Sequence, residues 1–500
     1  MSGGSGLKTI DHWVGGRTSP GTSGRSGPVY DPARGTQTAS VSLASATEVA
    51  DAVKVAADAA EDWGRSSLAS RASLLFHLRE LVFAHQDDLA AIITSEHGKV
   101  LSDARGEVAR GLECVDFACG IPSLLKGSFS SEVSTGIDVH TVPHPLGVVA
   151  GITPFNFPVM VPLWMLANAI ACGNSFVLKP SERDPSASVV LAGLVQRAGF
   201  PDGVVNVVHG DAEAVNALLA HPDVDAVSFV GSTPIARHVY ETGTRNGKRV
   251  QALGGAKNHM VVLPDADIGG AADAAISAAY GSAGERCMAI SVVVAVGSVA
   301  DPLVDAIAAR IPDVVVGPGD DPASMMGPLI TAQHRDRVRS YVEGASGEGA
   351  LVVVDGTAEE RGDGFFLGCS LLDRVTPGMK AYDDEIFGPV LGVVRVPDFR
   401  AAVALVNANP YGNGVAIFTS DGGAAREFER SVHVGMVGIN VPIPVPVASH
   451  SFGGWKSSLF GDAPIYGPEG IRFYTRPKVV TSRWPESGSS AVDLGFPSHR

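Results

Sequence analysis

The feature that most constrains the fold is a long stretch without a charged side chain, from residue 145 to residue 178. It is long enough to cross a bilayer as one helix, for which about 20 apolar residues suffice. However, Pro154, Pro158 and Pro162 interrupt it, and proline breaks a helix interior because it removes a backbone donor. We therefore expect no membrane span. The stretch instead predicts consecutive buried pieces: a strand over 147–152, a loop, a helix over about 159–171 and a strand over 175–178.

Helix-like and strand-like segments alternate along much of the chain. Four segments carry apolar residues at three- and four-residue intervals, which predicts amphipathic helices over 47–63, 67–86, 87–97 and 107–118. Short apolar runs of strand length follow at 204–208, 226–230, 260–263 and 292–296. This order is typical of parallel α/β sheets. A chain of 500 residues exceeds what one core can serve, so we expect at least two domains.

Composition excludes several classes of protein. The 53 acidic side chains outnumber the 38 lysines and arginines, and a formal charge of -15 argues against a nucleic-acid or anionic-membrane surface. The five cysteines are an odd number, which suits free thiols in a reducing compartment. No basic region followed by an apolar core opens the chain, so we expect a cytoplasmic protein. The histidines show no metal-ligand spacing such as HExxH, and we expect no metal.

Cys287 lies in a turn of small residues, GSAGERCMA over 281–289. The neighbouring Arg286 is a cation that would lower the pKa of the thiol, and the glycines would let a substrate approach the sulfur. The turn therefore predicts a nucleophile. The alternative is that Cys287 is a buried small hydrophobe, as most intracellular cysteines are.

Two further motifs follow predicted strands, where open α/β sheets bind ligands. Lys179 and Glu182 follow the strand over 175–178 and have the chemistry to hold ribose hydroxyls, although such a sequence is also typical of a solvated turn. Ser232 and Pro234 follow the run over 226–230 and predict a helix start, which binds phosphate or is simply capped by the serine. Neither a GxGxxG fingerprint nor a Walker A sequence is present, so an ordinary Rossmann dehydrogenase or P-loop protein is disfavoured.

An ordered set of motifs across nearly the whole chain resembles the aldehyde dehydrogenase superfamily. In chain order the motifs are TPFNFP (153–158), KPSE (179–182), FVGS (229–232), the cysteine turn (281–289), EIFGP (385–389) and FGGWKSS (452–458). Within the superfamily, three segments resemble the CoA-acylating branch that acts on methylmalonate semialdehyde: GAKNH (255–259), GERCM (284–288) and GWKSSLFG (454–461).

The resemblance implies a role for each matching residue. Cys287 would attack the aldehyde carbonyl, and the side-chain amide of Asn156 and the N–H of Cys287 would hold the oxyanion. The cofactor implied is NAD. Its expected contacts are Lys179 and Glu182 on the adenosine ribose, Ser232 on the pyrophosphate, Glu385 on the nicotinamide ribose, Phe387 near the nicotinamide, and Thr153, Phe155, Arg183 and Gly254 at further lining positions. The Glu182 acid would repel the 2′-phosphate of NADP, although the adjacent Arg183 weakens that inference.

One departure from the superfamily pattern concerns release of the acyl group. Hydrolytic members carry Glu-Leu-Gly-Gly-Lys, whose glutamate activates water, whereas this chain has ALGGAK over 252–257 without an acid. A CoA thiol is far more acidic than water and attacks a thioester without that base. We therefore expect methylmalonate or malonate semialdehyde to yield propionyl- or acetyl-CoA with loss of carbon dioxide. A hydrolytic aldehyde dehydrogenase with another base, and a non-catalytic binding protein of the same fold, are the alternatives.

A carboxylated substrate needs a cation, and guanidinium is the best bidentate partner. Arg110 and Arg286 match the family positions expected to hold the substrate carboxylate. Arg286 has a second possible role in stabilising the thiolate of Cys287. For Arg110 the alternative is a solvated charge on a helix.

The resemblance also implies the architecture: an α/β fold of the aldehyde dehydrogenase type with two Rossmann-like parallel-sheet domains and a β oligomerisation arm. The predicted units are an NAD-binding domain (1–127 and 146–254), a catalytic domain (255–445), and an oligomerisation arm and C-terminal segment (128–145 and 446–500). An exposed apolar arm strand would promote aggregation of a monomer. We therefore expect the arm and the segment around 472–483 to pair with another subunit in a homo-oligomer, a dimer or a tetramer.

Overall fold

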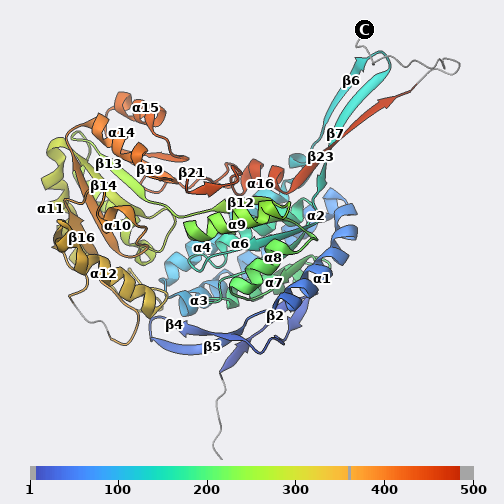
Figure 1. Ribbon diagram of the computed structural model, residues 1–500, viewed down its shortest axis with the longest axis horizontal. Helices are drawn as coiled ribbons and strands as arrows, with labels where there is room; N and C mark the ends of the chain where they lie inside the picture. The colour runs from blue at the N-terminus through green and yellow to red at the C-terminus, as the bar shows by residue number, and fades with distance from the viewer. Residues whose placement is uncertain (1–6, 359–361, 485–500) are drawn as a thin grey trace, which may run out of the picture.

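The computed structural model describes residues 7–358 and 362–484, which form two α/β lobes and an arm that projects from the first lobe (Figure 1). The first lobe contains most of the first half of the chain, and the second contains the segment from β13 (Asn258–Val262) to β20 (Met436–Ile439). The predictions made for the first six residues and for 485–500 lie outside the described residues.

The uncharged stretch forms the centre of the first lobe. It contains β8 (Val148–Ile152), α6 (Met160–Ala171) and β9 (Ser175–Lys179), and every residue of these three elements is buried. The predicted strand, loop, helix and strand are confirmed, and a single bilayer-crossing helix is wrong for this stretch. No helix within 7–358 or 362–484 combines the length and apolarity that a membrane crossing requires.

The first lobe is built on an eight-stranded sheet in the order β22-β12-β11-β8-β9-β10-β2-β3. Its five central strands run parallel, as apolar runs buried on both faces predict. The remaining strands of this sheet are β2 (His12–Val14), β3 (Arg17–Ser19), β10 (Val205–Val207), β11 (Val224–Val230), β12 (Arg249–Leu253) and β22 (Leu459–Phe460). A smaller sheet precedes the first helix and contains β1 (Lys8–Ile10), β4 (Ser26–Asp31) and β5 (Thr36–Ser42).

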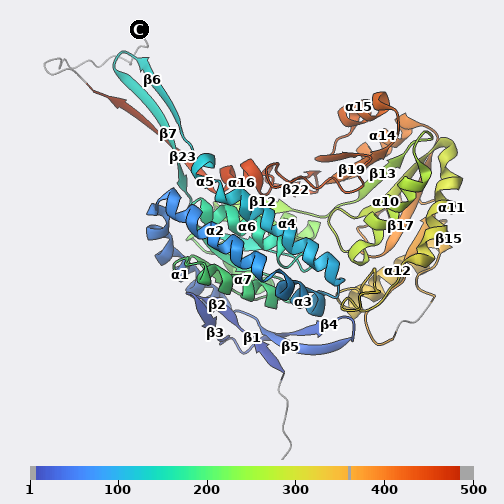
Figure 2. The ribbon, with the colours of Figure 1, turned by 180° about the vertical axis from the view of Figure 1, so that it is seen from behind.

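Helices cover both faces of this sheet (Figure 1, Figure 2). They are α1 (Ala46–Arg65), α2 (Leu68–Ala84), α3 (Gln86–His97), α4 (Leu101–Cys119), α5 (Ile121–Leu124), α7 (Ser186–Arg197), α8 (Ala212–Ala220) and α9 (Thr233–Arg245). The first four confirm the predicted amphipathic helices. Helix α1 begins with a capping box in which Ser45 and Glu48 satisfy each other's backbone N–H groups. Helix α4 begins six residues earlier than predicted, and its N-cap Val100 offers no side-chain cap that the sequence could have revealed.

The second lobe contains a seven-stranded sheet in the order β15-β16-β17-β14-β13-β19-β20. Its strands are β13 (Asn258–Val262), β14 (Ile290–Val296), β15 (Leu351–Val354), β16 (Ser370–Asp373), β17 (Val390–Val396), β19 (Gly414–Phe418) and β20 (Met436–Ile439). Its helices are α10 (Ile268–Tyr280), α11 (Ala300–Arg310), α12 (Ala332–Glu348), α13 (Lys380–Asp383), α14 (Phe399–Ala408) and α15 (Gly422–Ser431). The predicted division at residue 254 falls between β12 and β13.

The arm is a three-stranded antiparallel sheet that extends away from both lobes (Figure 1, Figure 2). Strand β7 (Ile137–Pro145) lies between β6 (Ser128–Ser134) and β23 (Thr475–Arg483), which follows α16 (Gly467–Phe473). The C-terminal strand thus pairs along its length with β7 of its own chain. In that sheet β23 is an edge strand, so its other edge stays open within the described residues, and the expected pairing of the C-terminal segment with another subunit stays a prediction. The expected homo-oligomer stays a prediction.

The C-terminal part of the chain also joins the lobes. Strand β22 pairs with β12 of the first sheet, while β21 (Trp455–Lys456) pairs with β18 (Tyr411–Gly412). Ser458, which lies between β21 and β22, donates its hydroxyl to the carbonyl of Gly255 at 2.8 Å and accepts from the N–H of Gly412 at 3.2 Å. One buried hydroxyl thereby ties both lobes together beside the segment that links β12 to β13.

Candidate active site

A cleft of about 870 Å³ lies between the two lobes. Its lining includes all the residues predicted for catalysis and for the cofactor: Thr153, Phe155, Asn156, Lys179, Glu182, Arg183, Ser232 and Gly254 from the first lobe, and Cys287, Glu385 and Phe387 from the second. Its volume lies within the range of about 300–1,000 Å³ that is usual for ligand sites. The chain thus brings motifs more than 200 residues apart to one cavity.

The first-lobe residues meet because they follow neighbouring parallel strands. The sheet order β12-β11-β8-β9 puts the carboxyl ends of these strands side by side. Thr153 to Asn156 follow β8, Lys179 ends β9, Ser232 follows β11 and Gly254 follows β12. This is the edge at which open α/β sheets bind ligands.

Lys179 and Glu182 are not a solvated turn. Lys179 is 5% exposed and donates from Nζ to the carbonyl of Gly210 at 2.8 Å, while the Glu182 carboxylate lies 3.5 Å away. Burial lowers the pKa of Lys179, and Glu182 opposes that shift. The pair offers an ammonium on the floor of the cleft and a carboxylate at its rim, the donor and acceptor that ribose hydroxyls require.

The start of α9 is open to an anion. Ser232 occupies the N-cap position and Pro234 lies in the first turn, as predicted, but the serine hydroxyl makes no capping hydrogen bond. The alternative of an ordinary serine-capped helix is therefore wrong. Helix N-termini bind phosphate through their free N–H groups and the helix dipole, so this end of the cleft suits a pyrophosphate.

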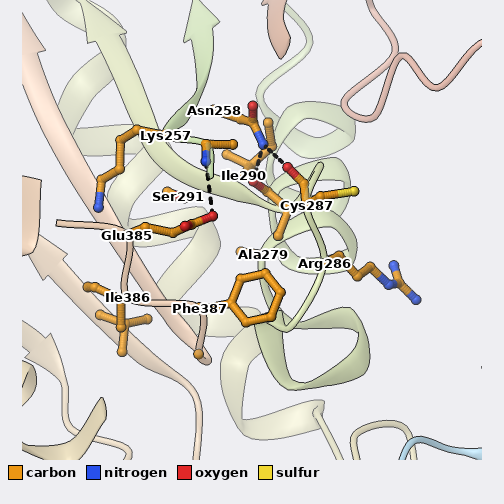
Figure 3. A pocket seen from close by; sticks show the side chains of 15 residues that line it. Lys257, Asn258, Ala279, Arg286, Cys287, Ile290, Ser291, Glu385, Ile386 and Phe387 are labelled. Carbon is orange, nitrogen blue, oxygen red and sulfur yellow. Dashed lines mark hydrogen bonds between the residues drawn. The ribbon is translucent and has the colours of Figure 1, made fainter. Parts of the chain in front are cut away.

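The turn that carries Cys287 has an unusual backbone. Ser282 and Ala283 both have φ of 53°, and Gly284 has φ of 74°, so three consecutive residues lie in the left-handed region. The carbonyl of Cys287 is firmly held, because it accepts from the side-chain amide of Asn258 at 2.9 Å (Figure 3). It also accepts from the side-chain amide of Asn413 at 3.1 Å. Strained backbone at a partly exposed cysteine is a feature of functional sites.

Arg286 lowers the pKa of Cys287 as predicted, but the net pKa of the thiol in the free protein is raised, not lowered. Burial raises the pKa of the thiol to about 12, and the Glu385 carboxylate adds to the rise. The N–H groups of Cys287 and Met288 and the Arg286 guanidinium favour the thiolate, but they do not overcome burial. Figure 3 shows the Arg286 side chain directed away from Glu385 and Phe387. Its Nη2 instead lies 2.7 Å from an Asp103 carboxylate oxygen.

Asn156 is 3% exposed and lines the cleft with Cys287. Its Nδ2 donates to the carbonyl of Glu285 at 3.1 Å, two residues before the cysteine. An amide nitrogen carries two hydrogens. One N–H therefore secures the side chain to the cysteine turn, and the second is left for a ligand.

Glu385 reaches across to the segment that joins the lobes. Its Oε1 accepts from the N–H of Ala256 at 3.0 Å (Figure 3). A Cβ added at Gly255 would lie 2.2 Å from Glu385 Oε2, so this carboxylate packs directly against the glycine. Burial raises the pKa of Glu385, whereas the Ala256 N–H and Lys257 oppose the rise.

Aromatic rings form one wall of the cleft. Phe155 contacts Phe387 edge to face with ring centroids 5.9 Å apart, and the Arg183 guanidinium lies 5.5 Å above the Phe155 ring. His334, on α12, donates from Nε2 to the carbonyl of Phe387 at 2.7 Å. Phe387 has a φ of 57°, so a side-chain contact helps to hold this strained residue.

The two arginines predicted for a substrate carboxylate lie outside the cleft lining, on the side of α4. Arg110 donates to both carboxylate oxygens of Glu113 at 2.9 and 2.8 Å and to the carbonyl of Pro446 at 2.9 Å. Arg286 is paired with Asp103, also on α4. Arg110 is thus neither free nor fully solvated, and each guanidinium already has an internal carboxylate partner.

Sequence reasoning missed several residues of the site. His334, Arg337 and Tyr341 line the cleft from α12, where nothing in their spacing signals a ligand. Tyr466 is buried and donates its hydroxyl at 3.0 Å to the same Pro446 carbonyl that Arg110 uses. Within 7–358 and 362–484, no group of three or more His, Cys, Asp or Glu side chains is arranged to hold a metal ion.

Comparison with known sequences places the chain among aldehyde dehydrogenases. A model of the aldehyde dehydrogenase family matches residues 19–480. The chain is 52% identical over 497 residues to a malonate-semialdehyde dehydrogenase of Pseudomonas aeruginosa, which covers 98% of this chain and 100% of the relative. It is 47% identical over 482 residues to malonate-semialdehyde dehydrogenase 2 of Geobacillus kaustophilus, which covers 96% of this chain and 100% of the relative.

Solved structures agree with the sequence relatives. A crystal structure of a methylmalonate-semialdehyde dehydrogenase of Sinorhizobium meliloti 1021 complexed with NAD superposes with a TM-score of 0.96 at 49% identity, covering 97% of this chain and 99% of that one. A methylmalonate-semialdehyde dehydrogenase of Oceanimonas doudoroffii superposes with a TM-score of 0.95 at 52% identity, covering 96% and 99%.

Proposed function

Because the chain belongs to the aldehyde dehydrogenase family, we propose that it catalyses the NAD-dependent, CoA-acylating oxidation of malonate or methylmalonate semialdehyde. The observation that carries this proposal is the make-up of the cleft around Cys287. The cleft offers a nucleophile and an amide donor, while the adjoining segment 252–257 contains no carboxylate. The names of the relatives favour the same substrates.

Cys287 begins the reaction by adding its sulfur to the aldehyde carbon. The carbonyl oxygen gains a negative charge, which the free N–H of the Asn156 amide and the N–H of Cys287 stabilise. The sulfur attacks as thiolate, so the proton must leave a thiol whose pKa is about 12 in the free protein. When bound, NAD supplies the acceptor for the hydride that leaves the thiohemiacetal carbon, and a thioester on Cys287 results.

The cleft fits NAD at each polar part of the molecule. Lys179 and Glu182 would hold the adenosine ribose, the open start of α9 at Ser232 the pyrophosphate, and Glu385 the nicotinamide ribose. Thr153, Phe155, Gly254 and Phe387 would complete the lining. The Glu182 carboxylate disfavours a 2′-phosphate, and Arg183 is engaged over Phe155, so NAD is favoured over NADP.

Release of the acyl group proceeds with CoA as substrate. Gly254 and Gly255 line the cleft, Ala252 is fully buried, and none of these residues can take a proton from water. A CoA thiolate displaces Cys287 from the acyl carbon and restores the free cysteine. The β-carboxylate beside the thioester carbonyl leaves as carbon dioxide. Malonate semialdehyde, NAD and CoA thus give acetyl-CoA, NADH and carbon dioxide.

Arg110 and Arg286 would bind the substrate carboxylate. Arg286 directly precedes Cys287 and pairs with Asp103, while Arg110 is held by Glu113 and the Pro446 carbonyl, and guanidinium groups can exchange one carboxylate partner for another. The substrate carboxylate would then displace Glu113 and Asp103 from the two guanidinium groups, or share these groups with them.

A hydrolytic aldehyde dehydrogenase is the second candidate function. Glu385 is the observation in its favour, because this carboxylate is near enough to raise the pKa of Cys287. If Glu385 activates water, the product is a free carboxylic acid.

NADH formation with and without CoA separates the two functions. We expect malonate semialdehyde and NAD to give one NADH per active site, and continuous turnover to acetyl-CoA only after CoA is added. Continuous NADH formation without CoA, with a free acid as product, would refute the CoA-acylating function. Glu385→Gln then tests whether this carboxylate is the base. No NADH from malonate or methylmalonate semialdehyde would refute the substrate assignment.

A non-catalytic protein of this fold is tested by alkylation. The thiol of Cys287 should react with iodoacetamide, and the reaction should be faster at higher pH. The rate of NADH formation should fall in proportion to the fraction of Cys287 that is alkylated. A cysteine that stays unmodified in the folded protein would favour the non-catalytic alternative.

A further inference from the structure

A fully buried ion pair lies behind the segment that carries Asn156. Lys99 Nζ is 2.8 Å from Glu107 Oε2, and both side chains have 0% exposure. Lys99 lies between α3 and α4, and Glu107 lies in the second turn of α4. Neither side chain lines the cleft.

Each member of the pair holds a different part of this loop. Lys99 Nζ donates to the main-chain carbonyl of Asn156 at 2.6 Å and lies 4.4 Å from the centre of the Phe157 ring. Glu107 Oε1 accepts from the N–H groups of Val159 at 2.8 Å and Met160 at 3.2 Å, where α6 begins. The ion pair therefore fixes the main chain at Asn156 and again three residues later.

Stability alone does not explain this arrangement. Removing two charges from water costs much of what their attraction returns, and apolar side chains of similar volume often serve as well. The N-terminus of α6 could also be capped by a local serine or aspartate, but its N-cap Val159 makes no side-chain cap bond. The pair instead makes its remaining hydrogen bonds to the segment that presents Asn156.

We propose that Lys99 and Glu107 are positioning residues that aim the Asn156 amide at the oxyanion. The inference rests on the proposed function only in taking Asn156 as the oxyanion donor. Lys99 holds the Asn156 carbonyl, and the Asn156 side-chain amide donates to the Glu285 carbonyl in the cysteine turn. With both ends of the residue fixed, the second amide N–H has one direction left. A shift of about 1 Å in such a donor can slow a reaction about 10²-fold.

A double-mutant cycle tests the proposal. Lys99→Met is made in the natural chain and in Asn156→Ala, and the NADH burst rate is measured with malonate semialdehyde. We expect Asn156→Ala to lower the rate about 10²- to 10³-fold. Lys99→Met should lower it about 10- to 100-fold in the natural chain and leave KM for NAD unchanged. In the Asn156→Ala background it should have no further effect, because a residue that acts through Asn156 has nothing left to position.

Arg71→Met is the matched control for a loss of stability. Arg71 is also a buried cation that donates to main-chain carbonyls, including that of Ala171 at the other end of α6. Its replacement should lower the thermal midpoint and leave the burst rate unchanged. If Lys99→Met behaves in the same way, or slows the burst equally in both backgrounds, the pair has only a structural role and the proposal fails.

A second variant covers the case in which an unpaired buried charge prevents folding. Lys99→Met with Glu107→Gln removes both charges together, so the remaining side chain is not left as an isolated ion. We expect this double variant to regain stability but keep the slow burst. A double variant with the natural burst rate would overturn the proposal.

Failure of the positioning proposal can be distinguished from failure of the proposed function. The NADH burst precedes any reaction with CoA. If turnover does not require CoA, the acylating function is refuted, but the rates in the double-mutant cycle can still be measured and interpreted. If neither semialdehyde reacts, 4-nitrophenyl acetate provides the same cycle, because attack of Cys287 on this ester also forms an oxyanion and releases nitrophenolate. An Asn156→Ala variant with natural rates in both assays refutes the positioning proposal itself.

Discussion

The two sides of Cys287 differ in how their polar groups are engaged. On the cofactor side, strand ends and the start of α9 surround an open cleft, and the Ser232 hydroxyl makes no cap bond. On the side of α4, the guanidinium groups of Arg110 and Arg286 are already paired with Glu113 and Asp103. One side is ready for a ligand, whereas the other must exchange partners to receive one.

This difference bears on specificity. A preformed cleft binds its ligand without reorganisation, so its contacts contribute directly to affinity. A carboxylate that displaces an internal one gains only the difference between two ion pairs. Aldehydes without a carboxylate would leave the internal pairs intact. The preference for a carboxylated aldehyde therefore depends on how well its carboxylate competes with Glu113 and Asp103 for the two guanidinium groups.

The largest effect should come from the residue between the two sides. Cys287→Ser should lower NADH formation by about 10⁴-fold or more, because a serine hydroxyl is a far weaker nucleophile than a thiolate. NAD affinity, measured by calorimetry, should stay unchanged because serine is close to cysteine in size and the proposed polar contacts of NAD are made by other residues. A large loss of NAD affinity would show that the cofactor side is not independent of the nucleophile.

Arg110→Gln should affect the α4 side only, and should weaken binding of the carboxylated substrate without changing binding of NAD. A charge-assisted contact is worth about 1.5–3 kcal/mol, and giving up the internal pair with Glu113 reduces that gain, so KM for malonate semialdehyde should rise by at most roughly 10- to 100-fold. KM for propanal, which has no carboxylate, and KM for NAD should change little. Arg105→Gln is the control, because Arg105 lies on the same helix but pairs with Asp87 at the surface. Equal losses with both aldehydes would refute a role in binding the carboxylate.

The pH dependence of Cys287 alkylation tests whether burial between the cofactor side and the α4 side controls the pKa of the thiol. With a pKa of about 12, the thiol is protonated at neutral pH, and its thiolate fraction grows as pH rises. Alkylation of the free protein by iodoacetamide should therefore speed up about tenfold per pH unit between about pH 7 and 9. The labelled residue is identified by mass spectrometry, with Cys287→Ser as the blank. A plateau at neutral pH would mean that Arg286 and the N–H groups outweigh burial.

Ser232→Ala should give the smallest effect. Because its hydroxyl caps nothing, its loss should change the free energy of unfolding by less than about 0.5 kcal/mol and weaken NAD binding only a few-fold. Asp398→Ala is the matched cap control, since Asp398 accepts from the Ala401 N–H at the start of α14. That replacement should cost about 1 kcal/mol and leave NAD binding unchanged. Equal destabilisation by both variants would refute the open helix start.

The contrast between the two sides also separates what a sequence can predict from what it cannot. The parallel strands were predictable because both of their faces are buried and their sequences are apolar throughout. Since ligand residues follow such strands, the residue pattern alone was enough to place Lys179 and Ser232 at one sheet edge. The cofactor side is thus a consequence of local patterns and sheet order.

The side chains around α4 could not be predicted in this way. Arg286 pairs with Asp103, which is 183 residues away, and a charge carries no mark of the partner it will take. Burial of Cys287 and its raised pKa depend on packing from both lobes, so the adjacent arginine was a misleading signal. Lys99 and Glu107 resemble ordinary helix-boundary charges until the loop that carries Asn156 is seen beside them.

The place of β22 has a consequence for the order in which the newly made chain can fold. This strand comes from Leu459 and Phe460, yet it completes the edge of the first sheet beside β12. The second-lobe sheet uses only residues 258–439, a continuous piece of the chain. During synthesis, the second lobe can therefore close before the first has its last strand. The sheet whose strand ends line the cleft therefore gains its edge strand only after the whole of the second-lobe sheet has been made.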